Sequence, residues 1–358
     1  MLSKGGSTDR PLFCLHPGKC VACRMMKMHH YPYSYYTLIL ALLFVSCSSK
    51  DEAANEIQLF FPPAQYPEFS GTRAHEFIVE QVAFGPRVPG TPSHDSCRAY
   101  FVSYFEDLGF DVEQQQFSLL GYENNRLPLT NIIVHVNPSA QRRILLAAHW
   151  DTRPWADMDP DPASRDLPIP GANDGGSGVA VLMEAARHFA ETPPSVGVDI
   201  VLFDGEDYGR DGDESMFCLG SKYYAAAHSG QRPLFGMILD LVGDIDAEFP
   251  REQFSSAYAQ DIQNLVWSAA ESLGLNRFTN RQHGAVLDDH VSLNKVAGIK
   301  TIDIIDATLV GHDKSSERRQ YWHTLNDTPD QCSAATLEEV GRLVLYITYG
   351  INGDSKQS

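Results

Sequence analysis

The chain has 358 residues, of which 43% are hydrophobic and 21% are charged, so it can bury a large core and is not a disordered polymer. The formal net charge is -18, and residues 1–46 hold five of the 28 basic residues but only one of the 46 acidic ones. Residues 47–358 therefore carry a net charge of about -22. This negative charge repels the phosphate backbone of nucleic acids and disfavours nucleic-acid binding.

Residues 1–46 have the features of an export signal. Basic and histidine residues precede the apolar run 37–46, which is short for a membrane span but matches the apolar region of a signal peptide. The sequence 43–47 (LFVSC) is similar to a lipobox, in which the cysteine is acylated and begins the mature protein. We therefore expect an exported bacterial lipoprotein, periplasmic or in the cell envelope, held to the membrane by a lipid on Cys47. The first residues, before Met26 or Met28, look like an over-long start.

The rest of the chain divides into a tether, one large domain and a short tail. We assign residues 47–69 to the acylated cysteine and a polar tether, residues 70–352 to the catalytic domain, and residues 353–358 to the tail. The domain holds Cys97, Cys218 and Cys332, and an odd number of cysteines gives no disulfide framework. At most one bridge could form among them.

Short apolar runs alternate with helical patterns along the domain. We expect helices over 72–81, 93–108, 178–190, 220–227, 257–273, 289–297 and 334–351, and strands over 112–117, 130–136, 144–148, 199–203, 236–241 and 300–305. This alternation predicts an α/β protein with a mixed, mostly parallel sheet and helices on both faces, that is, a single-domain three-layer α/β/α sandwich.

Polar residues stand where several of these strands should end. In open α/β sheets, ligands bind outside the carboxyl ends of the strands, so we expect these side chains to gather at one edge. They are His149 and Asp151 after the run 144–148, Asp174 in the glycine-rich turn 171–178, Glu206 and Asp207 after 199–203, Asp240 at the end of 236–240, and His323 in the segment 321–324.

The chemistry of these residues suits zinc. Imidazole and carboxylate are its usual ligands where no thiolate is present, and a catalytic site uses three protein ligands with one position open. Each residue also has an ordinary structural interpretation, because a histidine at a strand end is often satisfied locally and an aspartate in a glycine-rich turn often caps a helix. Their occurrence in this order on one alternating scaffold favours the metal site.

The order of the motifs resembles the zinc aminopeptidase clan and, within it, the glutaminyl cyclase branch in its bacterial, animal-type form. The resemblance covers roughly residues 70–352 and rests on 148–157 (AHWDTRPWAD), 204–208 (DGEDY), 218–221 (CLGS), 239–243 (LDLVG), 288–290 (DDH) and 321–324 (YWHT). It implies the zinc aminopeptidase-like fold. It also implies that N-terminal glutamine of peptides and proteins is converted to pyroglutamate with release of ammonia.

The resemblance also implies roles for individual residues. One zinc ion per chain would be bound by Asp174, Asp207 and His323, and Glu206 would carry the proton from the attacking amine to the departing ammonia. Asp240 and Asp288 would form an acidic hydrogen-bond network around Glu206, while Trp322 and Phe217 would wall the substrate pocket.

Three departures from the family pattern concern the pocket. Asp207 stands where many relatives have Glu, and Phe217 where a Trp is often found. Leu287 and Asp303 replace a Gln and a His that are common in animal relatives.

Two alternatives remain open at this point. The chain keeps all five residues that a two-zinc aminopeptidase would use, namely His149, Asp174, Asp207, Asp240 and His323, although Trp322 and the run 288–290 favour the cyclase. His149 and Asp151 are possible second-metal or supporting residues. A catalytically inactive binding lipoprotein on the same fold would show a missing ligand or a missing Glu206, and neither is missing.

Overall fold

The computed structural model describes residues 60–311 and 319–353, and it is built around a six-stranded sheet of order β1-β2-β4-β3-β5-β8. The strands are β1 (Asp111–Leu120), β2 (Arg126–Val136), β3 (Arg143–His149), β4 (Gly197–Phe203), β5 (Gly236–Asp240) and β8 (Thr301–Ile305). β2 is antiparallel to both β1 and β4, whereas β4, β3, β5 and β8 are mutually parallel. The mixed, mostly parallel sheet expected from the sequence is confirmed.

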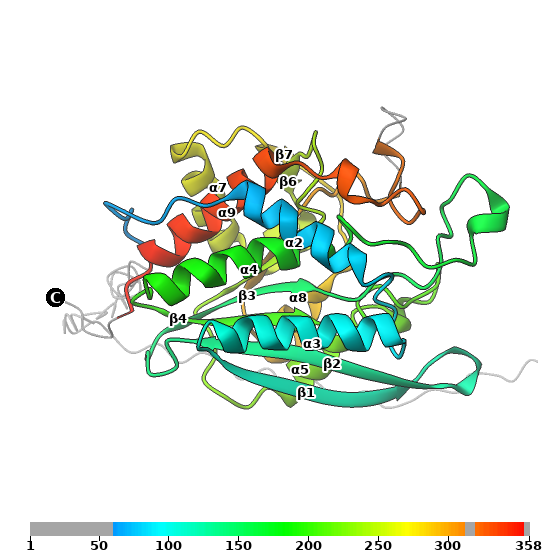
Figure 1. Ribbon diagram of the computed structural model, residues 1–358. Helices are drawn as coiled ribbons and strands as arrows, with labels where there is room; N and C mark the ends of the chain where they lie inside the picture. Colours follow the sequence, from blue (N-terminus) through cyan, green and yellow to red (C-terminus); the bar gives the residue numbers. More distant parts are fainter. Residues whose placement is uncertain (1–59, 312–318, 354–358) are drawn as a thin grey trace, which may run out of the picture. The chain divides into compact units, whose positions relative to one another are not determined.

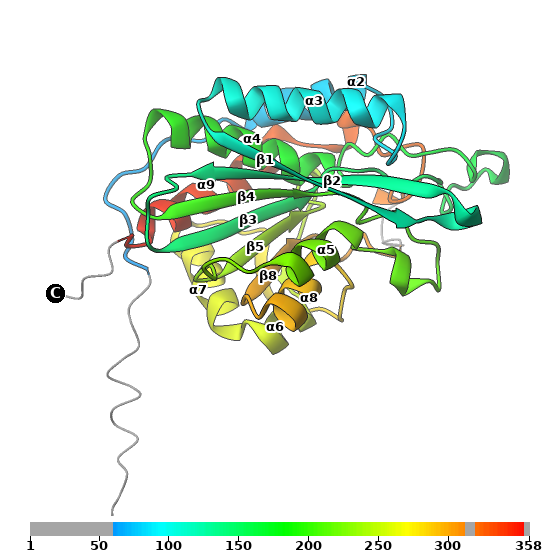
Figure 2. The same ribbon diagram turned by 90° about the horizontal axis from the view of Figure 1, so that it is seen from below.

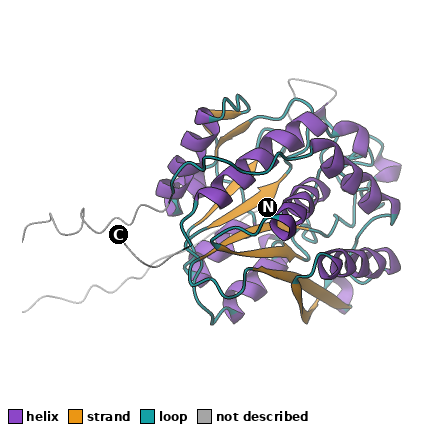
Figure 3. Cartoon of the chain, turned by 60° about the vertical axis from the view of Figure 1, so that its left-hand side comes forward, coloured by secondary structure: helices purple, strands orange, loops and turns teal. Residues whose placement is uncertain are grey.

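Helices cover both faces of this sheet (Figures 1, 2 and 3). α2, α3, α4 and α9 lie on one face, and α5, α6 and α8 lie on the other (Figure 2). The three-layer α/β/α arrangement is therefore confirmed. The helices are α2 (Gly71–Ala83), α3 (Pro92–Asp107), α4 (Gly176–Glu191), α5 (Leu219–Ala227), α6 (Gln253–Tyr258), α7 (Gln260–Ser272), α8 (Asp289–Ser292) and α9 (Ala334–Gly350).

The central strand β3 shows why the sheet needs a helix layer on each side. Ile144, Leu146 and Ala148 point into the larger core, which includes α4 and α9, whereas Leu145 and Ala147 point into the core beside α5. Every residue of this strand is buried. Strands buried on both faces read as unbroken apolar runs, and helices must cover each face to bury them.

Several elements differ from the sequence expectations. The helix expected over 257–273 is two helices, because the backbone at Ala259 leaves the helical region (φ -141°, ψ 42°). The helix expected over 289–297 is the single turn α8 followed by the π-helical turn η4 (Leu293–Ala297). A separate two-stranded sheet of β6 (Phe249–Arg251) and β7 (Phe278–Gln282) was not expected. Its strands are short and β7 is largely exposed, so no apolar alternation marks them.

The three cysteines of the domain form no disulfide. Cys97, Cys218 and Cys332 are all buried free thiols. None of the bridges that the sequence left open is present among them.

A close approach between α4 and β5 brings the start of α4 to the carboxyl edge of the sheet. A Cβ atom on Gly178 would lie 2.0 Å from the carbonyl oxygen of Leu239 and 2.9 Å from Cβ of Ala148. Only glycine allows this packing, and the packing sets where the turn before α4 lies relative to the ends of β3 and β5.

We predict that Gly178→Ala lowers the free energy of unfolding by about 1–3 kcal/mol, because an added methyl group in a tightly packed core forces backbone shifts. Urea denaturation followed by circular dichroism measures it. The matched control is Gly230→Ala, where the nearest atom to the new Cβ is Cε1 of His228 at 4.0 Å. This variant should stay within about 0.5 kcal/mol of the parent. Equal stability of the two variants would contradict the proposed packing role.

Candidate metal and active site

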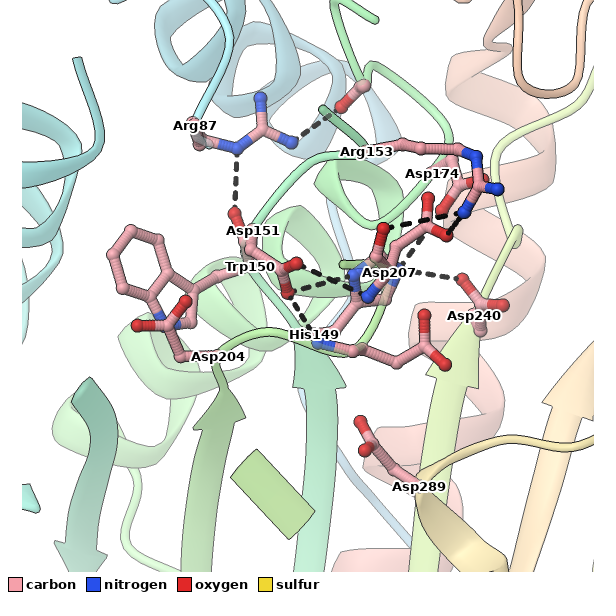
Figure 4. A network of polar contacts seen from close by, with 12 residues as sticks. Arg87, His149, Trp150, Asp151, Arg153, Asp174, Asp204, Asp207, Asp240 and Asp289 are labelled. Atoms are coloured by element: carbon pink, nitrogen blue, oxygen red, sulfur yellow. Dashed lines mark hydrogen bonds and ion pairs between the residues drawn. The ribbon is translucent and has the colours of Figure 1, made fainter. Parts of the chain in front are cut away.

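The carboxyl edge of the parallel strands gathers the polar residues singled out in the sequence. His149 ends β3, Asp240 ends β5, Glu206 and Asp207 follow β4, and Asp174 lies two residues before the start of α4. Figure 4 shows Asp174, Asp207 and Asp240 grouped around His149 at this edge. The expected convergence of these side chains is therefore observed.

Asp174, Asp207 and His323 form a compact, buried trio. One ligand atom from each lies within 4.8 Å of the others, and Nε2 of His323 is 3.6 Å from Oδ2 of Asp174 and 3.5 Å from Oδ2 of Asp207. Ligands bound to a tetrahedral zinc ion at 2.0–2.2 Å are roughly 3.3–3.6 Å apart. Oδ2 of Asp207 is buried and accepts no hydrogen bond. The donor set and its spacing fit a zinc ion.

Neighbouring side chains hold two members of the trio in place. Arg153 donates a hydrogen bond of 2.7 Å from Nη1 to Oδ1 of Asp207, which leaves Oδ2 facing the trio. Arg153 also binds both carboxylate oxygens of Asp157, at 2.8 and 2.6 Å. Asp157 in turn lies 3.6 Å from Nδ1 of His323, so that Nε2 is the ring nitrogen that faces the carboxylates.

The turn that carries Asp174 is held by a residue that the sequence did not single out. The carboxylate of Asp327 accepts the backbone N–H groups of Asn173 at 2.9 Å and Asp174 at 3.2 Å. Asp327 is fully buried, 153 residues away in the sequence from Asp174. Asp327 lies in a loop, neither directly after a strand nor at the start of a long helix. No local sequence pattern therefore indicates its role.

Asp151 supports the loop after β4 and does not face the trio. Its Oδ1 accepts the backbone N–H of Glu206 at 3.0 Å, and its Oδ2 accepts that of Asp207 at 3.3 Å. Both oxygens are therefore engaged in holding the two acidic residues side by side. Of the two sequence interpretations of Asp151, this geometry favours the supporting role.

His149 lies between two carboxylates. Its Nε2 is 3.1 Å from Oδ1 of Asp174 and 3.3 Å from Oδ1 of Asp240, and these three residues form a second group with metal-ligand spacing. Burial alone would lower the pKa of His149, but Asp151, Asp174 and Asp240 outweigh burial and raise it well above its ordinary value. The imidazole therefore favours its charged form when these carboxylates are its only partners.

Glu206 occupies a site that favours its protonated form. Burial raises the pKa of Glu206 well above its ordinary value, with further raising contributions from Asp288 and Asp207, while His149 opposes them. The thiol of Cys218 donates a hydrogen bond of 3.2 Å to Oε1 of Glu206. The quoted motif 218–221 contains this cysteine, but the sequence gave no reason to place its thiol against Glu206.

A small cavity opens beside these groups, with a volume of about 80 Å³. One end is acidic, because Asp174, Glu206, Asp207, Asp240 and Asp288 all line it. The apolar walls are Phe217, Leu241, Val286, Ile305, Val310 and Trp322.

The two aromatic walls named from the sequence both line this cavity. Trp322 stacks on His323, with ring centroids 3.5 Å apart and an interplanar angle of 22°. The guanidinium of Arg153 lies 5.5 Å from the ring centroid of Phe217. Gly209 makes room for this ring, because a Cβ atom there would lie 2.1 Å from it.

Left-handed backbone conformations concentrate at this site. Cys218, Leu241 and His323 have φ of 54°, 51° and 56°. Such conformations cost non-glycine residues free energy and persist only where the surroundings impose them. Cys218 donates a hydrogen bond to Glu206, Leu241 follows Asp240, and His323 belongs to the trio. Strained backbone of this kind is common where side chains must point toward a ligand.

Comparison with known proteins agrees with this geometry. The model of peptidase family M28 matches residues 131–348. The crystal structure of Bacteroides thetaiotaomicron glutaminyl cyclase is 38% identical with a TM-score of 0.76, and the match covers 80% of this chain and 99% of that one. A zinc-dependent exopeptidase from Parabacteroides distasonis is 39% identical with a TM-score of 0.75, with coverage of 80% and 99%.

A more distant relative is a eukaryotic enzyme. The glutaminyl-peptide cyclotransferase of Bos taurus is 23% identical over 295 residues, which cover 72% of this chain and 76% of the bovine one. The family model spans more than half of the chain, and the similar solved structures are matched over nearly their full length. The chain belongs to peptidase family M28.

Proposed function

We propose that this chain is a zinc-dependent glutaminyl cyclase that converts the N-terminal glutamine of peptides and proteins to pyroglutamate and releases ammonia. The observation that carries the proposal is the small cavity in which Glu206 stands beside the trio of Asp174, Asp207 and His323. This cavity joins acidic side chains, which can accept hydrogen bonds from an α-amine and an amide nitrogen, to apolar walls. The likeness to glutaminyl cyclases of bacteria and of Bos taurus supports the same function.

We assign one zinc ion per chain to Asp174, Asp207 and His323. Zinc bound there supplies a Lewis acid for the oxygen of the γ-carboxamide. Asp207 is suited to this position because Arg153 occupies one of its oxygens and leaves the other without a hydrogen bond. The likeness to a zinc-dependent exopeptidase agrees with the choice of metal.

Glu206 moves the proton in the proposed reaction. The α-amine nitrogen attacks the γ-carbonyl carbon and forms the ring C–N bond, and the carboxylate of Glu206 takes a proton from that nitrogen. Glu206 then delivers this proton to the amide nitrogen as the old C–N bond breaks, so that ammonia departs. A carboxyl whose pKa is raised can hold the proton between the two steps.

The other cavity residues orient the reacting groups and limit the entry of water. Asp240 and Asp288 line the acidic end, where they can accept hydrogen bonds from the α-amine and the leaving nitrogen. Phe217 and Trp322 belong to the apolar walls. Excluding water matters for this reaction, because water attacking the same carbonyl carbon would give glutamate instead of pyroglutamate.

The two-zinc aminopeptidase is the second candidate. One observation favours it, since His149, Asp174 and Asp240 form a second group with metal-ligand spacing that shares Asp174 with the first. The likeness to glutaminyl cyclases favours the first candidate.

The first experiment separates these two functions. We expect the protein to release ammonia from a peptide with N-terminal Gln, to leave a product lighter by one ammonia, and to carry one zinc ion per chain. Mass spectrometry of the product and elemental analysis of the protein measure these quantities. Release of a free N-terminal amino acid, with two metal ions per chain, would assign the protein to the aminopeptidases instead.

Two substitutions separate the proton carrier from the metal ligands. Glu206→Gln should keep the zinc content and the fold while kcat falls by roughly 10²–10⁴, because the amide cannot exchange the proton. His323→Ala should instead lose zinc, because one of three ligands is removed. Near-parental kcat in the first variant, or stoichiometric zinc in the second, would refute the corresponding role.

We further propose that the protein is exported and anchored by a lipid on Cys47. The signal, the lipobox and most of the tether lie in residues 1–59, outside the described residues. Over 60–311 and 319–353, the structure has no helix that is both long and apolar enough to cross a membrane.

For the anchor we expect the protein, produced in a bacterial host from residues 26–358, to incorporate labelled palmitate and to sediment with membranes. Cys47→Ala should lose both properties, because the acylated thiol is absent. Cys97→Ala is the control, since Cys97 is buried in the folded domain. Membrane association that persists in Cys47→Ala would rule out the anchor.

A further inference from the structure

Cys218 is an unfavourable residue for its place at the start of α5. It is the N-cap residue of this helix, but its side chain accepts no hydrogen bond from the first turn, which is the usual task of a residue at this position. Its backbone is left-handed (φ 54°, ψ 37°), a conformation that costs a residue with a Cβ atom free energy. Local structure alone would favour serine, asparagine or glycine here, so the cysteine needs another explanation.

The surroundings of Cys218 differ from those of the other two buried thiols. Cys97 and Cys332 belong to the large apolar core that includes α4 and α9. Cys218 belongs to none of the apolar clusters found among the described residues. Its sulfur instead lies within 4.8 Å of a carboxyl oxygen of Glu206 and of one of Asp288. Packing as a small apolar side chain therefore accounts for Cys97 and Cys332 but not for Cys218.

Two hydrogen bonds join Cys218 to Glu206. The thiol donates one of 3.2 Å to Oε1 of Glu206, and the backbone N–H of Cys218 donates one of 2.8 Å to the backbone carbonyl of Glu206. Glycine at position 220 permits this approach, because a Cβ atom on Gly220 would lie 2.6 Å from the carbonyl oxygen of Asp204. The start of α5 is therefore packed directly against the loop that carries Glu206.

The thiol acts as a donor in this arrangement. Burial raises the pKa of Cys218 well above its ordinary value, and the charges of Glu206, Asp289 and Asp288 raise it further, so the sulfur keeps its proton at neutral pH. Oε1 of Glu206 is therefore engaged as an acceptor. Over residues 60–311 and 319–353, no hydrogen bond or ion pair engages Oε2 of Glu206, although this side chain lines the cavity.

We propose that Cys218 is a positioning residue for Glu206, whose thiol holds Oε1 and so directs Oε2 toward the substrate. This inference rests on the proposed function, in which Glu206 carries the proton between the two nitrogens. A thiol suits this task because it is a weak donor, so it orients the carboxyl group without competing strongly with the substrate for it. The left-handed backbone and the missing cap are then consequences of placing the sulfur against Glu206.

Two small substitutions test this role in the zinc-loaded protein. Cys218→Ser keeps a donor toward Oε1 of Glu206, so kcat should stay within about threefold of the parent. Cys218→Ala removes the donor, so kcat should fall roughly tenfold with KM nearly unchanged, because Glu206 is still present but poorly oriented. Equal kcat in the two variants, whether low or high, would overturn the positioning role.

The other buried thiols supply matched controls. Cys97→Ala and Cys332→Ala each remove a buried sulfur from the apolar core, so they should lower the thermal midpoint but leave kcat near the parental value. A tenfold loss of kcat in either control would mean that Cys218→Ala acts through lost packing, and it would contradict the positioning role.

Infrared spectroscopy tests the hydrogen bond without relying on the reaction. Difference spectra between the parent and each alanine variant assign the S–H stretching band of each thiol. The band of Cys218 should lie at a lower frequency than those of Cys97 and Cys332, because a hydrogen bond weakens the S–H bond. It should move to a higher frequency in Glu206→Leu, where the acceptor is lost. An unshifted band, or one that Glu206→Leu leaves in place, would refute the contact.

The two kinds of measurement separate this inference from the proposed function. A shifted band without cyclisation of a Gln-peptide would refute the cyclase, and with it the positioning role, while the contact stands. Cyclisation with an unshifted band would refute the inference and leave the cyclase.

Folding of the variants is checked by zinc content and thermal midpoint. If Cys218→Ala does not fold, Cys218→Gly takes its place, because glycine adopts the left-handed backbone without strain and also lacks the donor. Its kcat should fall by the same factor, and parental kcat in this variant would contradict the inference.

Discussion

Buried negative charge is the constraint on which the rest of this site depends. Seven acidic side chains gather around the carboxyl edge of the sheet, namely Asp151, Asp174, Glu206, Asp207, Asp240, Asp288 and Asp289. An isolated carboxylate taken out of water costs several kcal/mol, so each of these groups needs a cation, a set of N–H donors or a proton. The structure uses all three solutions, and each solution gives the carboxyl group a different chemical character.

The distribution of the three solutions separates binding from catalysis. Asp151 and Asp327 are satisfied by backbone N–H groups and serve to hold loops. Oδ1 of Asp207 accepts a hydrogen bond from Arg153, whereas Oδ2 accepts none and faces Asp174 and His323. A carboxylate with one unpaired oxygen is suited to bind a metal. Glu206 has no basic side chain as a hydrogen-bond partner and receives only a weak thiol donor, so a proton is its remaining means of neutralisation. Under the proposed function, that difference distinguishes Glu206, as the proton carrier, from the neighbouring acids.

The sequence predicts the strand ends well because each of them combines two signals, a buried apolar run and a polar residue directly after it. A buried apolar run such as 144–148 marks a strand clearly, and although a single histidine or aspartate after it can be structural, several such residues in order on one sheet indicate a site. The supporting residues carry no such signal. Asp327 lies in a loop, and Cys218 stands before a helix that its side chain does not cap. Their roles depend on contacts with residues 12 to 153 positions away, which one sequence does not reveal.

Similar solved structures include a glutaminyl cyclase and a zinc-dependent exopeptidase, and the two candidate functions of this chain differ in the use of His149 and Asp240. His149 and Asp240 can bind a second metal, or they can bind each other. Here Nε2 of His149 is 3.3 Å from Asp240, and a Cβ atom on Gly175 would lie 2.4 Å from the same nitrogen. The ring is thus packed against the turn before α4, where a charged imidazole satisfies Asp174 and Asp240 together. Under the proposed single-zinc function, the charged imidazole takes the place of a second ion, and Asp240 lines the cavity beside Glu206.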